Sequence, residues 1–293
     1  NIADLLNNSG IFEELTGIPV EVDYGSEFRY RKTLLDKHSA LLAISQSGET
    51  ADTLAAIRDA KKRGVLTLGI TNVTGSTQAR ETDAGIYTRC GPEIGVASTK
   101  AFTSQVAALV LLTLFLGRQR QLTMTTGQRI AEGLLHIPEM IERILECDAQ
   151  IQELAEKYQR FDNFFFLGRK YNFPIAREGA LKIKEIAYVH SEGTRGGELK
   201  HGELALVTED FPSVCIAPKD TVYEKMVSNI QEIKARNGPV IAVTTEGNYD
   251  IGDLADDVIF IPETMEILTP LLSVIPLQMF AYHFAALRGC DID

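Results

Sequence analysis

The chain carries one pattern twice, in which short apolar runs typical of buried strands alternate with segments of helical periodicity. In the first copy we expect strands at 20–23, 40–45, 66–71 and 86–88, and helices at 51–63 and about 98–116. In the second copy we expect strands at 163–168, 214–217, 240–244 and 258–261, and helices at 174–188 and 221–236. Strands that alternate with helices predict parallel sheets covered by helices on both faces.

Matching residues relate the two copies. The matched pairs are Ile44 and Ile216, 172 residues apart, Gly64 and Gly238, 174 apart, and Ser26-Glu27 and Ser191-Glu192, 165 apart. A long period that drifts slowly indicates a duplicated unit and not a solenoid. Nothing before Ile18 matches the strand at 163–168, so the first unit is expected to lack its opening strand and loop.

We therefore predict three regions: an incomplete first α/β unit at 1–126, bridging helices at 127–160, and a second α/β unit at 161–293. Pro138 is expected to break the bridging helix or to open a second one, because proline lacks the N–H that a helix interior needs.

Composition excludes several classes of protein. A net charge of −11 argues against nucleic-acid binding, since a phosphate backbone requires clustered Lys and Arg. The four cysteines have neither metal-ligand nor disulfide spacing, which predicts no metal site and a reducing, cytoplasmic location. The apolar run at 106–116 is too short to span a bilayer, and the N-terminal stretch lacks a signal-peptide pattern, so no membrane association is expected.

A loop rich in hydroxyl groups follows the strand at 40–45. Ser45, Gln46, Ser47 and Thr50 surround Gly48 at the start of the helix at 51–63. Free N–H groups and the positive end of the helix dipole make such a junction a site for phosphate or carboxylate. The alternative is ordinary helix capping by Ser or Thr, which needs no ligand.

Two observations favour the anion site. The second copy keeps the strand and helix but has Ala217-Pro218-Lys219-Asp220 in place of the serines, so the fold does not require them. The overall negative charge also means that any anion must be held by local donors rather than by long-range attraction.

Charged residues form a stripe on the predicted helix at 174–188. Glu178, Lys182 and Glu185 share one face, and a carboxylate beside a lysine can act as a tuned base. The pattern alone favours an ordinary solvated helix face, with Gly179, Ala180, Ile183, Ile186 and Ala187 turned to the core. The polar, glycine-rich segment 191–202 that follows is expected to be a functional loop, and its His201 could move protons near neutral pH.

A third polar segment, 95–103, opens the helix at 98–116. Ser98 and Thr99 are expected to cap that helix whatever the function. Loops at the carboxyl ends of parallel strands share one crevice, so this segment is expected to line the same pocket as 45–50.

Four motifs closely resemble the double SIS (sugar isomerase) domain of the glutamine–fructose-6-phosphate aminotransferase family. They are Ser45–Thr53, Glu93–Phe102, Glu178–Lys182 and Gly197–Gly202, and the similarity runs from about Gly17 to Asp293. The resemblance implies an α/β fold of two tandem SIS subdomains, each a flavodoxin-like αβα sandwich. It also implies a role in making glucosamine 6-phosphate, with no metal or organic cofactor.

The resemblance also implies residue roles. Ser45, Gln46, Ser47 and Thr50 would hold the phosphate of fructose 6-phosphate or glucosamine 6-phosphate, while Val96 and Ser98 would contact the sugar. Glu185 would move the proton between C1 and C2 of the sugar, Lys182 would support that step, and His201 from a neighbouring subunit would open the sugar ring. A homodimer with a shared active site follows, joined in the full-length protein to a glutaminase domain.

This chain departs from the family at several points. The family's Cys-Gly-Thr-Ser loop and the tail lysine that forms a Schiff base are missing, and Arg195 and Glu203 replace small or proline residues. The chain as given is therefore expected to bind a sugar phosphate without completing amino transfer. Two alternatives stay open: another double-SIS deglycase or deaminase, and a sugar-phosphate-binding module without chemistry.

Overall fold

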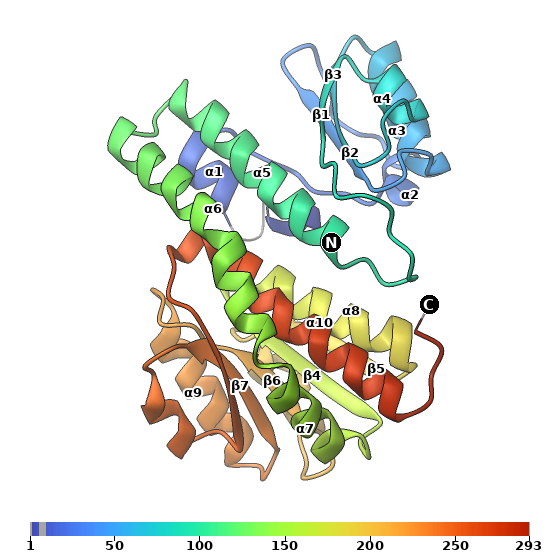
Figure 1. Cartoon of the computed structure of the whole chain (residues 1–293). Helices are drawn as coiled ribbons and strands as arrows, with labels where there is room; N and C mark the ends of the chain where they lie inside the picture. The colour runs from blue at the N-terminus through green and yellow to red at the C-terminus, as the bar shows by residue number, and fades with distance from the viewer. Residues whose placement is uncertain (1, 6–9, 293) are drawn as a thin grey trace.

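The structure, a computed structural model, describes residues 2–5 and 10–292. In Figure 1 a small α/β unit lies beside a helical hairpin, above a larger α/β unit.

The first half contains α1 (Ile11–Thr16), α2 (Gly25–Phe28), β1 (Ala40–Ser45), α3 (Ala51–Lys62), β2 (Leu66–Thr71), α4 (Thr77–Glu81), β3 (Ala84–Tyr87) and α5 (Lys100–Arg118). Linking helices are α6 (Met124–Leu145) and α7 (Asp148–Tyr158). The second half contains β4 (Asn163–Gly168), α8 (Phe173–Ala187), β5 (His190–Arg195), β6 (Ser213–Ile216), α9 (Tyr223–Lys234), β7 (Val240–Thr245), β8 (Asp257–Ile261) and α10 (Thr269–Leu287).

The second half is a complete parallel sheet between two helical layers. Its strand order is β5-β4-β6-β7-β8, which is the flavodoxin-like order 2-1-3-4-5. Side chains of β4 alternate between the layers: Phe164 packs with Phe280 and Phe284 of α10, and Phe166 joins the same cluster, while Phe165 lies in the separate cluster that includes α9. Both faces are thus buried, as a parallel sheet requires, and the predicted αβα sandwich is confirmed.

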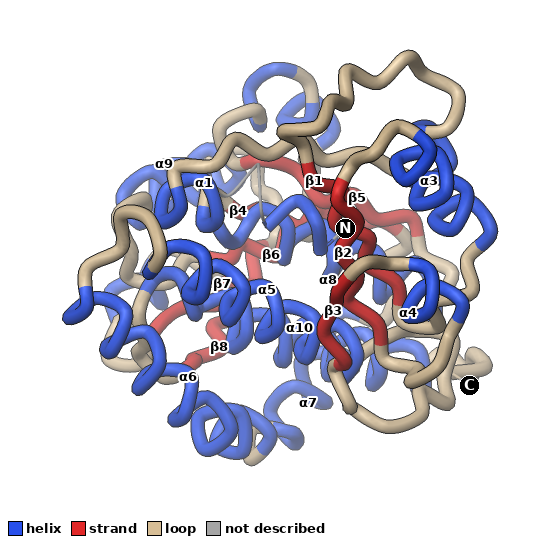
Figure 2. The backbone as a smooth tube through the Cα atoms, turned by 90° about the horizontal axis from the view of Figure 1, so that it is seen from above, coloured by secondary structure: helices blue, strands red, loops and turns tan. Residues whose placement is uncertain are grey.

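The first half has a shorter parallel sheet, β1-β2-β3, in which Ala40 pairs with Leu66. In Figures 1 and 2, α3 and α4 lie on the outer side of this sheet and α5 on the side of the second half. These strands correspond to β6-β7-β8, so within the described residues nothing occupies the positions of β4 and β5. The predicted loss of the opening strand is confirmed there.

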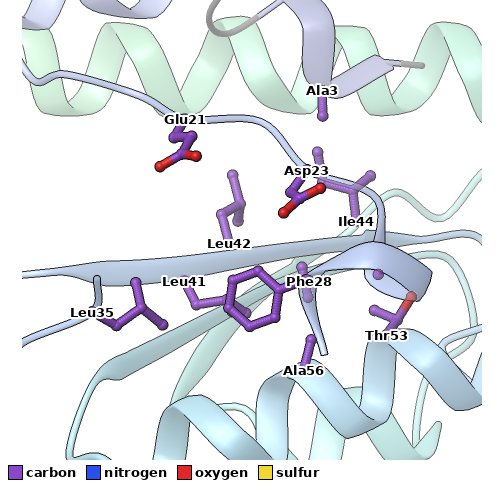
Figure 3. A pocket seen from close by; sticks show the side chains of 12 residues that line it. Ala3, Glu21, Asp23, Phe28, Leu35, Leu41, Leu42, Ile44, Thr53 and Ala56 are labelled. Carbon is purple, nitrogen blue, oxygen red and sulfur yellow. The ribbon is translucent and has the colours of Figure 1, made fainter. Parts of the chain in front are cut away.

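The strand predicted at Val20–Asp23 is wrong, and the shortened sheet supplies the reason. In the second half β5 pairs only with β4, and the first half has no described strand at the β4 position. Figure 3 shows the result: Glu21 and Asp23 face Leu41 and Leu42 of β1 across an open pocket. Residues with strand-like sequence therefore stay irregular because their hydrogen-bonding partner is missing.

Two further expectations are corrected. Residues 191–195, predicted as the beginning of a polar loop, belong to the edge strand β5, which pairs with β4 along its whole length. Pro138 neither breaks nor opens a helix, since it lies inside α6 on the exposed side, and the break comes at Glu146–Cys147. Burial of Ile137 and Ile144 holds α6 together across the hydrogen bond that proline cannot make.

Two segments, Lys100–Arg118 and Glu266–Leu287, have the length and hydropathy of membrane spans. The second of these is mostly buried inside the protein, where α10 packs beside α8 over the second sheet (Figure 1). An apolar composition on all sides is what a central core helix requires.

Candidate active site

A polar cleft of about 390 Å³ opens at the carboxyl end of β1, between the first half and α8. Six of the nine predicted site residues line it: Ser45, Gln46, Val96, Ser98, Lys182 and Glu185. They come from three segments far apart in the sequence, so the fold brings the hydroxyl-rich loop, the loop before α5 and the charged helix to one place. Ser47 and Thr50 belong to the same loop but do not line the cleft, and neither does His201.

The loop after β1 is shaped by Gly48 and its own hydroxyls. Gly48 has φ +67°, and a Cβ there would lie 2.3 Å from Ser76 Oγ. The Gly48 N–H donates to Ser45 Oγ (3.1 Å), and the Glu49 N–H donates to Ser47 Oγ (3.2 Å). Two serines therefore hold the loop in its turn, and the hydroxyl proton of Ser47 stays available to an acceptor.

Helix capping does not account for this loop. Thr50 is the N-cap residue of α3, yet its side chain makes no hydrogen bond to the first turn. Its Oγ1 lies instead 3.3 Å from Ser45 Oγ. The first N–H groups of α3 thus have no side-chain cap, which leaves the positive helix end open to an anion.

Three charged residues of α8 form a linked cluster. Lys182 Nζ lies 3.2 Å from Glu178 Oε1 and 2.9 Å from Glu185 Oε2. Only 4% of the Lys182 side chain and 5% of the Glu178 side chain are exposed, against 31% for Glu185. The interpretation of this stripe as a solvated helix face is therefore wrong, because the packing of α8 against the first half removes Glu178 and Lys182 from water.

Burial governs the electrostatics of the cluster. Loss of solvation raises the pKa of Glu178, and the charge of Lys182 opposes that rise. Glu185 stands at the wetter end, where a carboxylate held by one ammonium group can accept a proton from a bound molecule. The predicted core residues of this helix, among them Gly179 and Ile183, are buried as expected.

The loop before α5 is held by a residue whose role the sequence did not suggest. Thr99 is the N-cap residue of α5 but makes no side-chain cap, so its predicted capping is wrong. Glu93 takes that role from six residues upstream, where its carboxylate accepts hydrogen bonds from the N–H groups of Thr99 and Ala101. This contact closes the loop that carries Val96 and Ser98 into the cleft.

His201 lies on the short 3-10 helix η3 (Leu199–His201), exposed on the surface of the second half. Its loop is fastened by the two unusual residues noted in the sequence. Thr194 Oγ1 donates to Glu203 Oε1 (2.9 Å), and the Arg195 guanidinium stacks over Phe173 at 4.5 Å. Within one chain His201 therefore stands apart from the cleft.

Sequence reasoning missed several residues that line the cleft, among them Tyr24, Phe102 and Gln105. Tyr24 Oη also accepts a hydrogen bond from Arg177 (2.8 Å) and so ties the first half to α8. Gln105 follows the polar residues Thr103 and Ser104 at the start of α5, so no sequence signal singled it out. Within the described residues, no group of three or more His, Cys, Asp or Glu is placed to hold a metal ion.

Comparisons with known proteins show the family to which this chain belongs. A family model described as the SIS domain matches residues 9–115 and 158–288. The chain belongs to the SIS domain family. Glutamine–fructose-6-phosphate aminotransferases [isomerizing] are similar over 97% of the chain, with 50% identity for that of Chlorobaculum tepidum and 48% for that of Thermus thermophilus. The SIS chain covers 46% and 47% of these relatives, about half their length.

Solved structures agree with the SIS assignment. The C-terminal domain of glucosamine-fructose-6-phosphate aminotransferase from Francisella tularensis matches with TM-score 0.94 and 37% identity, over 100% of this chain and 84% of that one. A glucosamine-6-phosphate deaminase from Thermotoga maritima matches with TM-score 0.79 and 24% identity, over 99% and 84%. The second likeness shows a shared fold alone.

Proposed function

We propose that this chain is the isomerase part of a glutamine–fructose-6-phosphate aminotransferase, which binds fructose 6-phosphate and glucosamine 6-phosphate and interconverts ketose and aldose. The observation that carries the proposal is the meeting of the hydroxyl-rich loop with the Lys182–Glu185 pair in one cleft. One side offers donors for a phosphate, and the other offers a base for a carbon-bound proton. The names of the relatives that match 97% of the chain support it.

In this proposal each segment has one task. Ser45, Gln46, Ser47 and Thr50 bind the phosphate together with the N-terminus of α3, and Val96 and Ser98 contact the sugar. Glu185 takes a proton from C1 of the open-chain ketose, which gives an enediol, and returns it to C2 while the O1 hydroxyl proton passes to O2, so that the ketose becomes the aldose. Lys182 stabilises the negative charge that develops on the sugar oxygens meanwhile.

Binding is tested on the chain itself by thermal melting with glucosamine 6-phosphate. We expect a higher Tm with millimolar ligand and a smaller increase for Ser47→Ala, because ligand that binds only the folded state stabilises it. Thr123→Ala, which removes the N-cap of α6, is the matched hydroxyl control and should keep the full ligand effect. A melting curve unmoved by the ligand would rule out the sugar-phosphate site.

Chemistry is tested by solvent exchange. In deuterated water the chain should exchange the C2 proton of glucosamine 6-phosphate, and Glu185→Gln should stop the exchange while binding persists. Exchange by Glu185→Gln at the rate of the parent would show that Glu185 is not the base. Binding without exchange in the parent would favour the non-catalytic binding module.

The shared active site is part of the same proposal. Because His201 lies outside the cleft of its own chain, it would act in the cleft of a second copy. Mixing Glu185→Gln chains with His201→Asn chains should then restore about a quarter of the exchange activity, since half of the dimers are mixed and each has one intact site. Mixtures that stay inactive would contradict a site shared between two copies.

A further inference from the structure

Gln105 is a mostly buried residue at the cleft whose amide makes no hydrogen bond to the described part of the protein. It lies on α5 one turn after Phe102, and both residues line the cleft beside Glu178 and Lys182. Its relative exposure is 8%. Among the hydrogen bonds of the described residues, none involves its side chain.

The amide of Gln105 is free to bond a molecule in the cleft. It is not among the described buried side-chain polar atoms that lack a partner, so solvent in the cleft can reach it. A side-chain amide closed off from water is normally bonded to another group. Gln78 is a fully buried amide in the same chain: its Nε2 donates to the carbonyls of Ala43 and Ile70, each at 3.1 Å, while its Oε1 has no partner. Gln105 differs in lining a polar cleft, where a bound molecule can supply the missing partner.

The chemistry of that partner follows from the amide. A carboxamide both donates and accepts, carries no charge, and matches a hydroxyl group, which does the same. A phosphate would find stronger donors at the other end of the cleft, around Ser45 and the start of α3. We propose that Gln105 is a specificity-determining residue that hydrogen-bonds a hydroxyl of the bound sugar.

This inference rests on the proposed function and names what selects the sugar in that cleft. A site whose buried polar group is satisfied only by the correct hydroxyl rejects analogues that lack it.

The test compares Gln105→Leu with Gln78→Leu. Gln105→Leu breaks no hydrogen bond to the described part of the protein, so the Tm without ligand should stay equal, whereas Gln78→Leu should lower it by breaking two hydrogen bonds. Titration calorimetry should show at least about a tenfold weaker Kd for glucosamine 6-phosphate with Gln105→Leu, the value of one lost hydrogen bond. Inorganic phosphate should stabilise the parent and Gln105→Leu equally.

Monodeoxy derivatives of glucosamine 6-phosphate then identify the contact. Removal of one particular sugar hydroxyl should weaken binding to the parent. The same removal should not weaken binding to Gln105→Leu any further, as a double-mutant cycle requires for two groups that contact each other. Unchanged Kd for Gln105→Leu, or a Tm loss like that of Gln78→Leu, would overturn the role of Gln105. Failure of the parent to bind glucosamine 6-phosphate would instead overturn the proposed function.

Discussion

The conformation of the hydroxyl-rich loop depends on a single glycine, Gly48. Gly48 combines a left-handed φ of +67° with contacts that leave no room for a Cβ, because Ser76 Oγ and Thr71 Oγ1 would lie 2.3 and 2.8 Å away. Gly64 has a similar φ of +72° but faces open space. Alanine substitutions at the two glycines therefore distinguish two costs: backbone strain is present at both positions, whereas steric crowding is present only at Gly48.

We expect Gly48→Ala to lower the free energy of unfolding by about 3 kcal/mol, the sum of strain and displacement of Ser76. Gly64→Ala, the matched control, should cost about 1 kcal/mol from backbone strain alone. Denaturant unfolding of both variants measures the difference. Equal losses would show that the loop yields to the added Cβ.

At the scale of elements, α5 depends on a carboxylate that lies outside it. Glu93 bonds two N–H groups of its first turn and holds the loop of Val96 and Ser98 at the cleft. Glu93→Ala should lower the free energy of unfolding by about 1 kcal/mol and weaken glucosamine 6-phosphate binding several-fold. Thr123→Ala removes the cap of α6 and should cost similar stability without affecting the ligand. Equal ligand binding by both variants would show that Glu93 does not position the loop at the cleft.

The loop between β6 and α9 replaces the hydroxyl-rich loop in the second copy, and it carries a half-buried carboxylate, Asp220. Burial raises the pKa of Asp220 to about 6, a rise that the Val222 N–H bond to its carboxylate opposes. The folded state thus binds the proton more tightly than the unfolded chain, so stability falls as the pH rises from about 4 through 6.

Asp220→Asn keeps the hydrogen bond acceptor and removes the titration. We expect the variant to be more stable than the parent at pH 7, by about 1 kcal/mol because the carboxylate is only partly buried, and equal to it near pH 4. Urea unfolding at both pH values measures this. A stability gain of the same size at pH 4 would show that the gain does not come from the titration of Asp220.

At the scale of the whole molecule, the two sheets differ in how they protect their central strands. β6 is hydrogen-bonded on both sides, by β4 and β7, whereas β1 pairs with β2 alone and faces the pocket of Figure 3 on its other edge. Amides of β1 should therefore exchange with deuterated solvent at least about tenfold faster than those of β6. Hydrogen exchange read by mass spectrometry tests this, and equal protection would show that the β1 edge is covered in solution.

The sequence predicted most elements well where local pattern and packing agree. The bounds of β1, β2 and β4 match their apolar runs, and α3 begins at the residue expected. Prediction failed where a neighbouring strand decides whether a segment becomes a strand. Val20–Asp23 has residues typical of a strand but no strand beside it. Residues 190–195 are polar, yet they form β5 because β4 lies beside them. The boundaries at 126 and 160, and the roles of the nine site residues, stay predictions.

The sequence by itself determined the duplicated α/β architecture, the placement of the hydroxyl-rich loop before α3, and the stripe of Glu178, Lys182 and Glu185 on one helix. These depend on periodicity and on residues close together in the chain. Only the tertiary structure decided that α8 faces that loop across a cleft, that Lys182 is buried between two carboxylates, and that the Gln105 amide makes no hydrogen bond to the described part of the protein. The reason is physical, because burial and hydrogen bonding between segments more than a hundred residues apart depend on how helices and sheets pack, which no local pattern encodes.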